Sequence, residues 1–333
     1  MKSEPSASFE RVHYLLRPAK NIQRKMLSEV FQRLEQIRSL KDYEYVGLGS
    51  IYFGDFILFH RALGLNRMTS IELEANWDRA DFNKPYRCVT VLSGRASERL
   101  PEINWKERPA IVWLDYDCEL SREILSDIRQ VASSVQPGSV LIVTLDATDK
   151  ALKDLPEEPT DTFDVEQFAD ASLIKKLNLK CGVELSADTD LTGDGLSETY
   201  RQLLTQAILE SVNAFVDPRS GAPTVAYSQV VNFRYSDGRE MMTVGGVFCP
   251  LTPHGTSCLV HYGFDKLEFY CPSDSVFRIE VPKLTYRELG TLNQSLPTDD
   301  LASIPVFITE EDKSLYSKIY RYFPTFAEAD VSS

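Results

Sequence analysis

Short apolar runs alternate with segments of helical periodicity through the first half of the chain. The runs are rich in Val, Ile and Leu and are apolar on both faces, which is typical of strands covered by helices on both sides. They predict strands at 43–49, 68–73, 87–93, 110–115 and 139–146. Helices are expected between them, at 53–64, 76–84 and 119–138. This alternation predicts right-handed crossovers and a parallel sheet.

An amphipathic helix is expected before the first strand, over residues 19 to 40. Its apolar positions recur at helical spacing, at Ile22, Met26, Val30, Phe31, Leu34 and Ile37. Its polar face is basic, with Arg17, Lys20, Arg24 and Lys25. Two interpretations stay open: a solvated helix face, or the rim of a pocket that receives an anionic substrate, phosphate or nucleic acid.

The pattern changes after residue 146. Residues 147–224 are acidic and interrupted by Pro and Gly, with helical stretches expected near 165–178 and 198–215. Two strand-like runs over 224–250 meet at the turn Ser236-Asp237-Gly238-Arg239, which is typical of an antiparallel hairpin. Residues 257–283 suggest further strands, and 285–296 and 310–323 suggest helices.

These elements predict an α/β, Rossmann-like, doubly wound and mostly parallel sheet that ends in an antiparallel hairpin, with an acidic insertion and a C-terminal extension. We expect an N-terminal basic helix (1–41), a Rossmann domain (42–256) carrying the insertion at about 147–224, and C-terminal strands and helices (257–333) that pack on the core. The insertion and the C-terminal region are expected to form a substrate lid. The oligomeric state is left open.

Composition narrows the class of protein. The 333 residues are 43% hydrophobic, which is enough for a large core, and the net charge of −13 argues against attraction of nucleic acid to the whole surface. No apolar run reaches about eighteen residues and no secretory signal is recognisable, so a cytoplasmic protein without membrane contact is expected. Six scattered cysteines without a Cys-x-x-Cys pair are interpreted as reduced thiols.

The first strand runs into Gly47-Leu48-Gly49. Two glycines at a strand end let the backbone approach a ligand, as in nucleoside-binding folds. The third glycine of the dinucleotide fingerprint is missing, because Tyr52 occupies its position. A nicotinamide-dependent oxidoreductase is therefore disfavoured, and a nucleoside cofactor without phosphates fits better.

Polar residues also stand at the ends of the next strands. Glu72 ends the second strand and can accept hydrogen bonds from both hydroxyls of a ribose, with Glu74 as the nearby competitor. Ser93-Gly94-Arg95 ends the third strand and Asp115-Tyr116-Asp117 the fourth. Asp115 or Asp117 could equally be the N-cap of the following helix.

With these features the chain resembles the class I S-adenosylmethionine-dependent methyltransferases. The resemblance rests on Gly47 and Gly49, the acids Glu72 and Asp115, Pro137-Gly138 before the fifth strand, and the closing hairpin. It covers roughly residues 40–150 and 224–250.

The resemblance implies that S-adenosylmethionine is the cofactor. Gly47, Gly49 and Ser50 would contact its amino acid moiety, Glu72 its ribose, and Ser93, Gly94 and Arg95 its adenine, while Asp115 would face the transferred methyl group. The family usually has an acid two residues before the first glycine, where this chain has Tyr45. Asp55 could supply that carboxylate instead.

The predicted reaction is methylation of oxygen on a small or medium-sized substrate, for which an anionic acceptor is one option. The fourth strand lacks the Asn/Asp-Pro-Pro-aromatic signature of enzymes that methylate amino groups of nucleic acids, which favours an oxygen acceptor. Asp115, Tyr116 and Asp117 are the predicted catalytic residues. A magnesium ion bound between Asp115 and Asp146 is less expected than a metal-free site, because Ala147 replaces the Asn that follows the strand-five acid in catechol-type enzymes. The alternative is a catalytically inactive cofactor-binding regulatory module.

Overall fold

We analysed a computed structural model of the chain, which describes residues 17–149, 173–212, 224–250, 258–298, 300–305 and 307–324. The other residues are not considered further. They include the N-terminal segment and most of the expected 165–178 helix.

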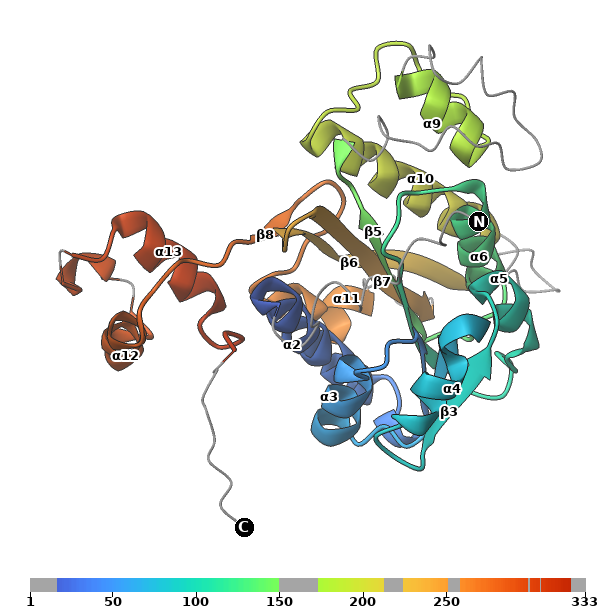
Figure 1. The fold of residues 1–333 in the computed structure, drawn as a ribbon, viewed down its shortest axis with the longest axis horizontal. Coiled ribbons are helices and arrows are strands. Elements are labelled where there is room, and N and C mark those ends of the chain that lie inside the picture. Colours follow the sequence, from blue (N-terminus) through green and yellow to red (C-terminus); the bar gives the residue numbers. More distant parts are fainter. Residues whose placement is uncertain are drawn as a thin grey trace.

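A single sheet forms the centre of the molecule (Figure 1). Its strand order is β3-β2-β1-β4-β5-β7-β6-β8. β7 runs antiparallel to its neighbours β5 and β6, and the other pairs are parallel. The strands are β1 (Glu44–Leu48), β2 (Met68–Glu72), β3 (Val89–Ser93), β4 (Ala110–Asp115), β5 (Val140–Asp146), β6 (Val225–Ser236), β7 (Glu240–Pro250) and β8 (Phe277–Ile279). The predicted Rossmann-like sheet and its β6–β7 hairpin are confirmed.

The sheet does not end at the hairpin, because the short strand β8 pairs in parallel with β6. The expectation of several strands over 257–283 is wrong for the described part of that range, which otherwise forms α11 (Cys258–His261), η5 (Phe264–Lys266) and loops. Its aromatic and aliphatic residues, such as Phe264, Leu267 and Phe269, are buried in the core from these loops. Apolar content alone could not distinguish them from strand residues.

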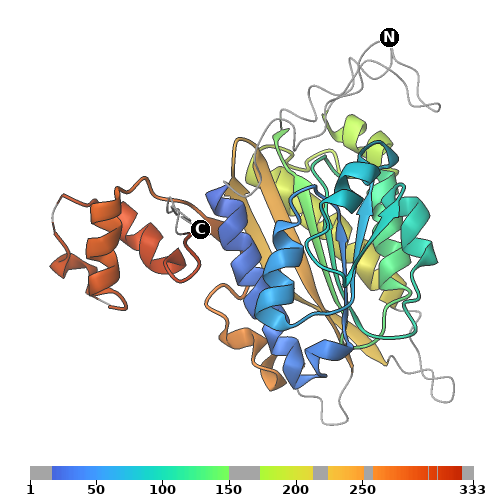
Figure 2. The same cartoon turned by 60° about the horizontal axis from the view of Figure 1, so that its bottom comes forward.

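Helices cover both faces of the sheet (Figure 2). One face packs against α2 (Pro18–Arg33), α3 (Gly54–Leu63), α4 (Glu74–Phe82) and α11. The other face packs against α5 (Ala96–Arg99), α6 (Arg122–Ala132), α9 (Leu173–Cys181) and α10 (Asp194–Val212). α10 lies against α6 and β6, so part of the acidic segment is the crossover helix between β5 and β6.

Helix α2 buries a larger part of its surface than its amphipathic pattern predicts. Besides its apolar residues it buries three polar ones, Lys20, Gln23 and Arg24. Asp237, in the β6–β7 turn, accepts a hydrogen bond from the backbone N–H of Lys20 at 3.0 Å, and a carboxylate is favourable at this positive end of a helix. The hairpin turn therefore fixes the start of α2.

A small C-terminal lobe stands apart from the sheet (Figure 1). It contains α12 (Tyr286–Ser295), η6 (Leu301–Ser303) and α13 (Glu310–Ile319) around the cluster Leu292, Ile304, Ile308 and Tyr316. Its end contacts α2: Lys25 Nζ donates to the Phe323 carbonyl at 3.2 Å, and the Tyr322 hydroxyl bonds to Glu29. The lobe is therefore joined to the outer side of that helix.

Cys249 is disulfide-bonded, which corrects the expectation that all six cysteines are reduced, whereas Cys88, Cys118, Cys181 and Cys271 are free. None of the helices in the described ranges is long and apolar enough to cross a membrane.

Two glycines of β7 allow unusually close packing of the neighbouring strands. A Cβ on Gly246 would lie 2.1 Å from the Ser228 carbonyl oxygen, and one on Gly245 would lie 2.6 Å from that of Leu141. The β6 register shifts between Gln229 and Val231, opposite Gly246, and such a bulge bends the strand. Glycine is needed here because the atoms in the way belong to backbone, which cannot rotate aside.

We therefore expect Gly246→Ala to lower the free energy of unfolding by about 1–3 kcal/mol, the usual cost of overpacking. Gly290→Ala is the matched control, because Gly290 lies in α12 with open space around its Cβ position. That substitution should leave stability unchanged or raise it by up to about 1 kcal/mol. Urea denaturation of the two variants would measure both effects, and equal stabilities would refute the close packing.

Candidate active site at the carboxyl edge of the sheet

The turn after β1 lies directly over the end of β2. The Gly49 N–H donates to the Ile71 carbonyl at 2.6 Å. A Cβ on Gly49 would lie 2.8 Å from Ser70 Oγ and 2.9 Å from Glu72 Oε2. Gly49 is therefore required for these two side chains to reach the space beneath the turn.

Glu72 and Ser70 bring unsatisfied polar atoms to this position. Glu72 is 7% exposed and Ser70 is fully buried. Glu72 Oε1 accepts from the Leu73 N–H at 2.9 Å, but Glu72 Oε2 and Ser70 Oγ have no hydrogen-bond partner. Because buried polar groups are normally paired, two such atoms side by side indicate a place where a ligand hydroxyl can bind. Glu74, the competing acid, is exposed on α4.

The pKa of Glu72 is raised. Burial disfavours the carboxylate, and the negative charge of Asp117 acts in the same direction, whereas hydrogen bonds from Leu73 and Asn76 oppose the rise. A ligand hydroxyl that donates a hydrogen bond to Glu72 Oε2 would offset the free-energy cost of burying this carboxylate.

Tyr45 stands where an acid is expected before the glycine turn, and its hydroxyl contacts a different acid, Asp55. Its ring lies over Gly47, where a Cβ would be 2.9 Å from the Tyr45 hydroxyl. That hydroxyl bonds to Asp55, which lies in the first turn of α3. Burial raises the pKa of Asp55, while the positive charge of Arg24 lowers it. The sequence-based suggestion that Asp55 supplies the carboxylate near this turn is consistent with that position.

Asp115, at the end of β4, forms an ion pair with Lys20 of α2. Lys20 Nζ lies 2.5 Å from Asp115 Oδ1 and 3.3 Å from the Tyr235 hydroxyl, and it sits 4.7 Å from the centre of the Trp113 ring. Burial lowers the pKa of Lys20, whereas Asp115 raises it. The pair lies at the same edge as Gly49 and Glu72, because β4 is the neighbour of β1 in a parallel pair.

The structure does not bring Tyr116 together with Asp115. Successive strand residues point to opposite faces, and Tyr116 packs on the α6 side, where its hydroxyl donates to Asp127 at 2.8 Å. Asp117 is exposed and close enough to Glu72 to raise its pKa. Neither acid caps α6, because its N-cap is Ser121, so that alternative is wrong.

Ser93, Gly94 and Arg95 follow β3 at the same edge. The Gly94 N–H donates to the Glu72 carbonyl at 2.9 Å, so this loop passes beside the end of β2. Gly94 has φ 138°, a conformation that favours glycine. The exposed Arg95 begins α5, and its backbone N–H donates to Glu98.

Asp146 is occupied by the protein's own groups. Its Oδ2 lies 3.0 Å from Arg239 Nη1, and its Oδ1 accepts from the Thr148 N–H at 2.9 Å. Asp115 is likewise paired with Lys20. Within the described residues no group of three or more His, Cys, Asp or Glu side chains could hold a metal ion.

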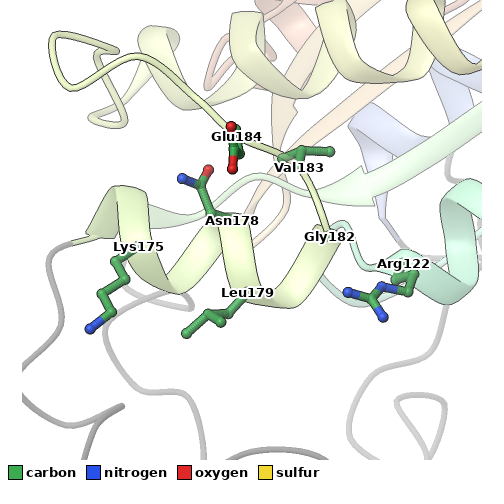
Figure 3. Close-up of a pocket in the computed structure, with 7 residues that line it drawn as sticks. All are labelled: Arg122, Lys175, Asn178, Leu179, Gly182, Val183 and Glu184. Atoms are coloured by element: carbon green, nitrogen blue, oxygen red, sulfur yellow. The ribbon is translucent and has the colours of Figure 1, made fainter.

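A cavity of about 440 Å³ lies elsewhere, between the start of α6 and the end of α9 (Figure 3). It is lined by Arg122, Lys175, Asn178, Leu179, Gly182, Val183 and Glu184. None of the residues predicted from sequence lines it.

Sequence reasoning missed Ser70 and Tyr235 and left the direction of Lys20 open. Ser70 could have been found, because it is a polar residue in an apolar strand, two positions before Glu72 and therefore on the same face. Tyr235 comes from β6, far along the chain, and no local pattern indicates that it meets Lys20.

We expect Glu72→Gln to raise the free energy of unfolding by about 1 kcal/mol at pH 7, because it removes a buried charge and keeps the shape. An acid whose pKa is raised by folding costs stability above that pKa and nothing below its unfolded value. The gain should therefore vanish as the pH falls below about 4.5. Glu74→Gln, at an exposed position, should give no gain. Denaturation curves between pH 4 and pH 8 test this, and a gain independent of pH would contradict it.

Comparisons with known proteins bear on this site. The family model described as "Putative O-methyltransferase" matches residues 12–331. No curated protein matches the chain. Among solved structures, a probable spermidine synthase from Corynebacterium glutamicum is 9% identical with a TM-score of 0.42, covering 73% of this chain and 69% of its own.

Two other solved structures are similarly distant. An O-methyltransferase family protein from Burkholderia thailandensis is 15% identical over 69% of this chain and 60% of its own, with a TM-score of 0.32. A LepI complex with SAM is 8% identical over 74% of this chain and 50% of its own, with a TM-score of 0.36. Because these TM-scores are below 0.5, the conclusion rests on the family match, which spans nearly the whole chain and confirms the predicted resemblance. The chain belongs to this O-methyltransferase family.

Proposed function

We propose that the protein binds S-adenosylmethionine at the carboxyl edge of the sheet and transfers its methyl group to an oxygen atom of a small or medium-sized acceptor. The observation that carries the proposal is the buried Glu72 Oε2, which lies without a partner beneath the Gly49 turn. A ribose hydroxyl is the group that this acceptor atom suits, since it donates a hydrogen bond and adds no charge.

The residues at the edge fit the parts of such a cofactor. Glu72 and Ser70 would hold the ribose, and the loop from Ser93 to Arg95, which contacts the end of β2, would lie along the adenine. Tyr45, Ser70 and Glu72 fill the Cβ positions of Gly47 and Gly49, so the amino acid moiety would lie against the backbone of this turn and Ser50, with Asp55 near its ammonium group. When bound, the sulfonium centre supplies an electrophilic methyl group.

Asp115 is the group we assign to the acceptor. As a bond forms from a hydroxyl oxygen to the methyl carbon, the hydroxyl proton must leave, and a carboxylate at the end of β4 can accept it. Lys20 holds that carboxylate from one side through Nζ and is itself fixed by Trp113 and Tyr235. We treat Lys20 as a positioning residue and exclude Tyr116, whose hydroxyl is bonded to Asp127.

The acceptor class remains a proposal based on charge. Lys20 and Arg24 turn inward and are 4% and 7% exposed, so they do not form a surface stripe for a phosphate backbone. Lys20 is already paired with Asp115, so Arg24 is the cation that a small anionic molecule entering this edge would meet. Action in the cytoplasm stays a prediction from sequence.

Two substitutions test the cofactor site. Gly49→Val should displace Glu72 and Ser70, and Glu72→Ala should remove the ribose acceptor, so each should weaken S-adenosylhomocysteine binding at least tenfold, the loss of one charge-assisted hydrogen bond. Glu74→Ala should bind as the wild type does. Isothermal calorimetry measures all three affinities. Unchanged binding by both site variants would refute the assignment, and tight binding without methyl transfer would favour the inactive regulatory module.

A second pair of substitutions tests the assignment of Asp115 as the general base. Asp115→Asn should lower kcat by about 10²–10⁴-fold, the usual range for loss of a general base, whereas Tyr116→Phe should change kcat by less than about threefold. Transfer of radiolabelled methyl from S-adenosylmethionine to a metabolite extract provides the rate. S-adenosylhomocysteine binding by both variants checks that the site is intact. A larger loss in Tyr116→Phe than in Asp115→Asn would overturn the assignment.

A further inference from the structure

Arg24 of α2 is a buried cation without a hydrogen-bond partner at two of its nitrogens. The residue is 7% exposed, and Nε and Nη1 are buried and unpaired. A guanidinium offers five N–H donors and no acceptor, so buried nitrogens without a partner are costly. A fold does not keep such a group without a compensating interaction, and the described residues do not provide one at these atoms.

The neighbouring cation on the same helix shows the contrast. Lys20, one turn earlier, has Asp115 at 2.5 Å, the Tyr235 hydroxyl at 3.3 Å and the Trp113 ring beneath it. Arg24 follows Lys20 by four residues, so both buried side chains lie on the same face of α2. The protein therefore pairs Lys20 with Asp115, whereas Nε and Nη1 of Arg24 have no hydrogen-bond partner.

Asp55 does not provide the missing hydrogen-bond partner of Arg24. Its carboxylate is already bonded to the Tyr45 hydroxyl, and among the described side chains no ion pair within 4.0 Å joins it to Arg24. The charge of Arg24 nevertheless lowers the pKa of Asp55 against the effect of burial, so the two groups lie near each other. A cation and an acid separated in this way match a ligand that carries both a carboxylate and an ammonium group.

We propose that Arg24 is the receptor for a carboxylate group of a ligand bound at the carboxyl edge of the sheet. A carboxylate matches the guanidinium in charge and supplies acceptors for the unpaired N–H groups. This inference rests on the proposed function, and two sources of the carboxylate are consistent with it. One is the amino acid moiety of the cofactor, whose ammonium group would face Asp55, and the other is an acidic group on the methyl acceptor.

The first arm of the test compares S-adenosylhomocysteine with its decarboxylated analogue, which keeps the amine and lacks only the carboxylate. If the cofactor supplies the group, Arg24→Met weakens binding of S-adenosylhomocysteine about 10- to 100-fold and of the analogue less than threefold. Calorimetry on the full chain measures both. Equal weakening of the two ligands would overturn the proposal, because it would indicate general damage to the site.

The second arm addresses the acceptor. If the acceptor supplies the carboxylate, Arg24→Met leaves S-adenosylhomocysteine affinity unchanged but abolishes binding of acetate to the complex with S-adenosylhomocysteine, which the wild type shows as a saturable heat. Absence of any Arg24-dependent difference for both probes would overturn the proposal. Failure of the wild type to bind S-adenosylhomocysteine and its analogue would instead refute the proposed function itself.

Stability of the ligand-free protein provides a readout that needs no cofactor. Removing an unpaired buried cation should stabilise the empty protein, so Arg24→Met should raise Tm by about 2 °C or more. Arg129→Met is the matched control, because Arg129 lies in helix α6, has a side chain that is 46% exposed and pairs with Glu210 at 3.6 Å. It should not raise Tm. A Tm of Arg24→Met below that of the wild type would show that Arg24 is structural and would overturn the proposal.

Discussion

The ion pair between the buried Lys20 and the partly exposed Asp115 holds α2 against the end of β4. A buried ammonium group is costly without a partner, so the position of the helix depends on this contact. Asp237 fixes the start of the same helix through the β6–β7 turn. Because α2 is held at both points, its next inward residue, Arg24, is also kept on the buried side of the helix.

Most of the fold could be predicted from sequence, and the reason is visible in particular strands. β4 and β5 are buried on both faces, so their Val, Ile and Leu runs mark them to within one residue. The region after β7 could not be predicted, because buried loop residues such as Phe264 and Phe269 resemble strand residues in composition. Local patterns report burial, but they do not report whether the backbone is extended.

The candidate site could be predicted where chemistry is local to a strand end. Gly49 and Glu72 are examples, since the turn and the acid each follow a recognisable strand. The inward direction of Lys20 could not be predicted, because its partners lie 95 and 215 positions away and a charged helix face normally points to solvent. Strand alternation, by contrast, already separates Tyr116 from Asp115, and applying it would have removed Tyr116 from the predicted catalytic set.

Helix α2 carries functional contacts on one side and the C-terminal lobe on the other. Lys20 and Arg24 point toward the sheet, whereas Lys25 and Glu29 hold Phe323 and Tyr322. The same chain end is buried against the core, where the Tyr322 and Phe269 ring centres lie 5.8 Å apart. The end of the chain therefore covers the outer side of the helix that presents Lys20 and Arg24 to the sheet.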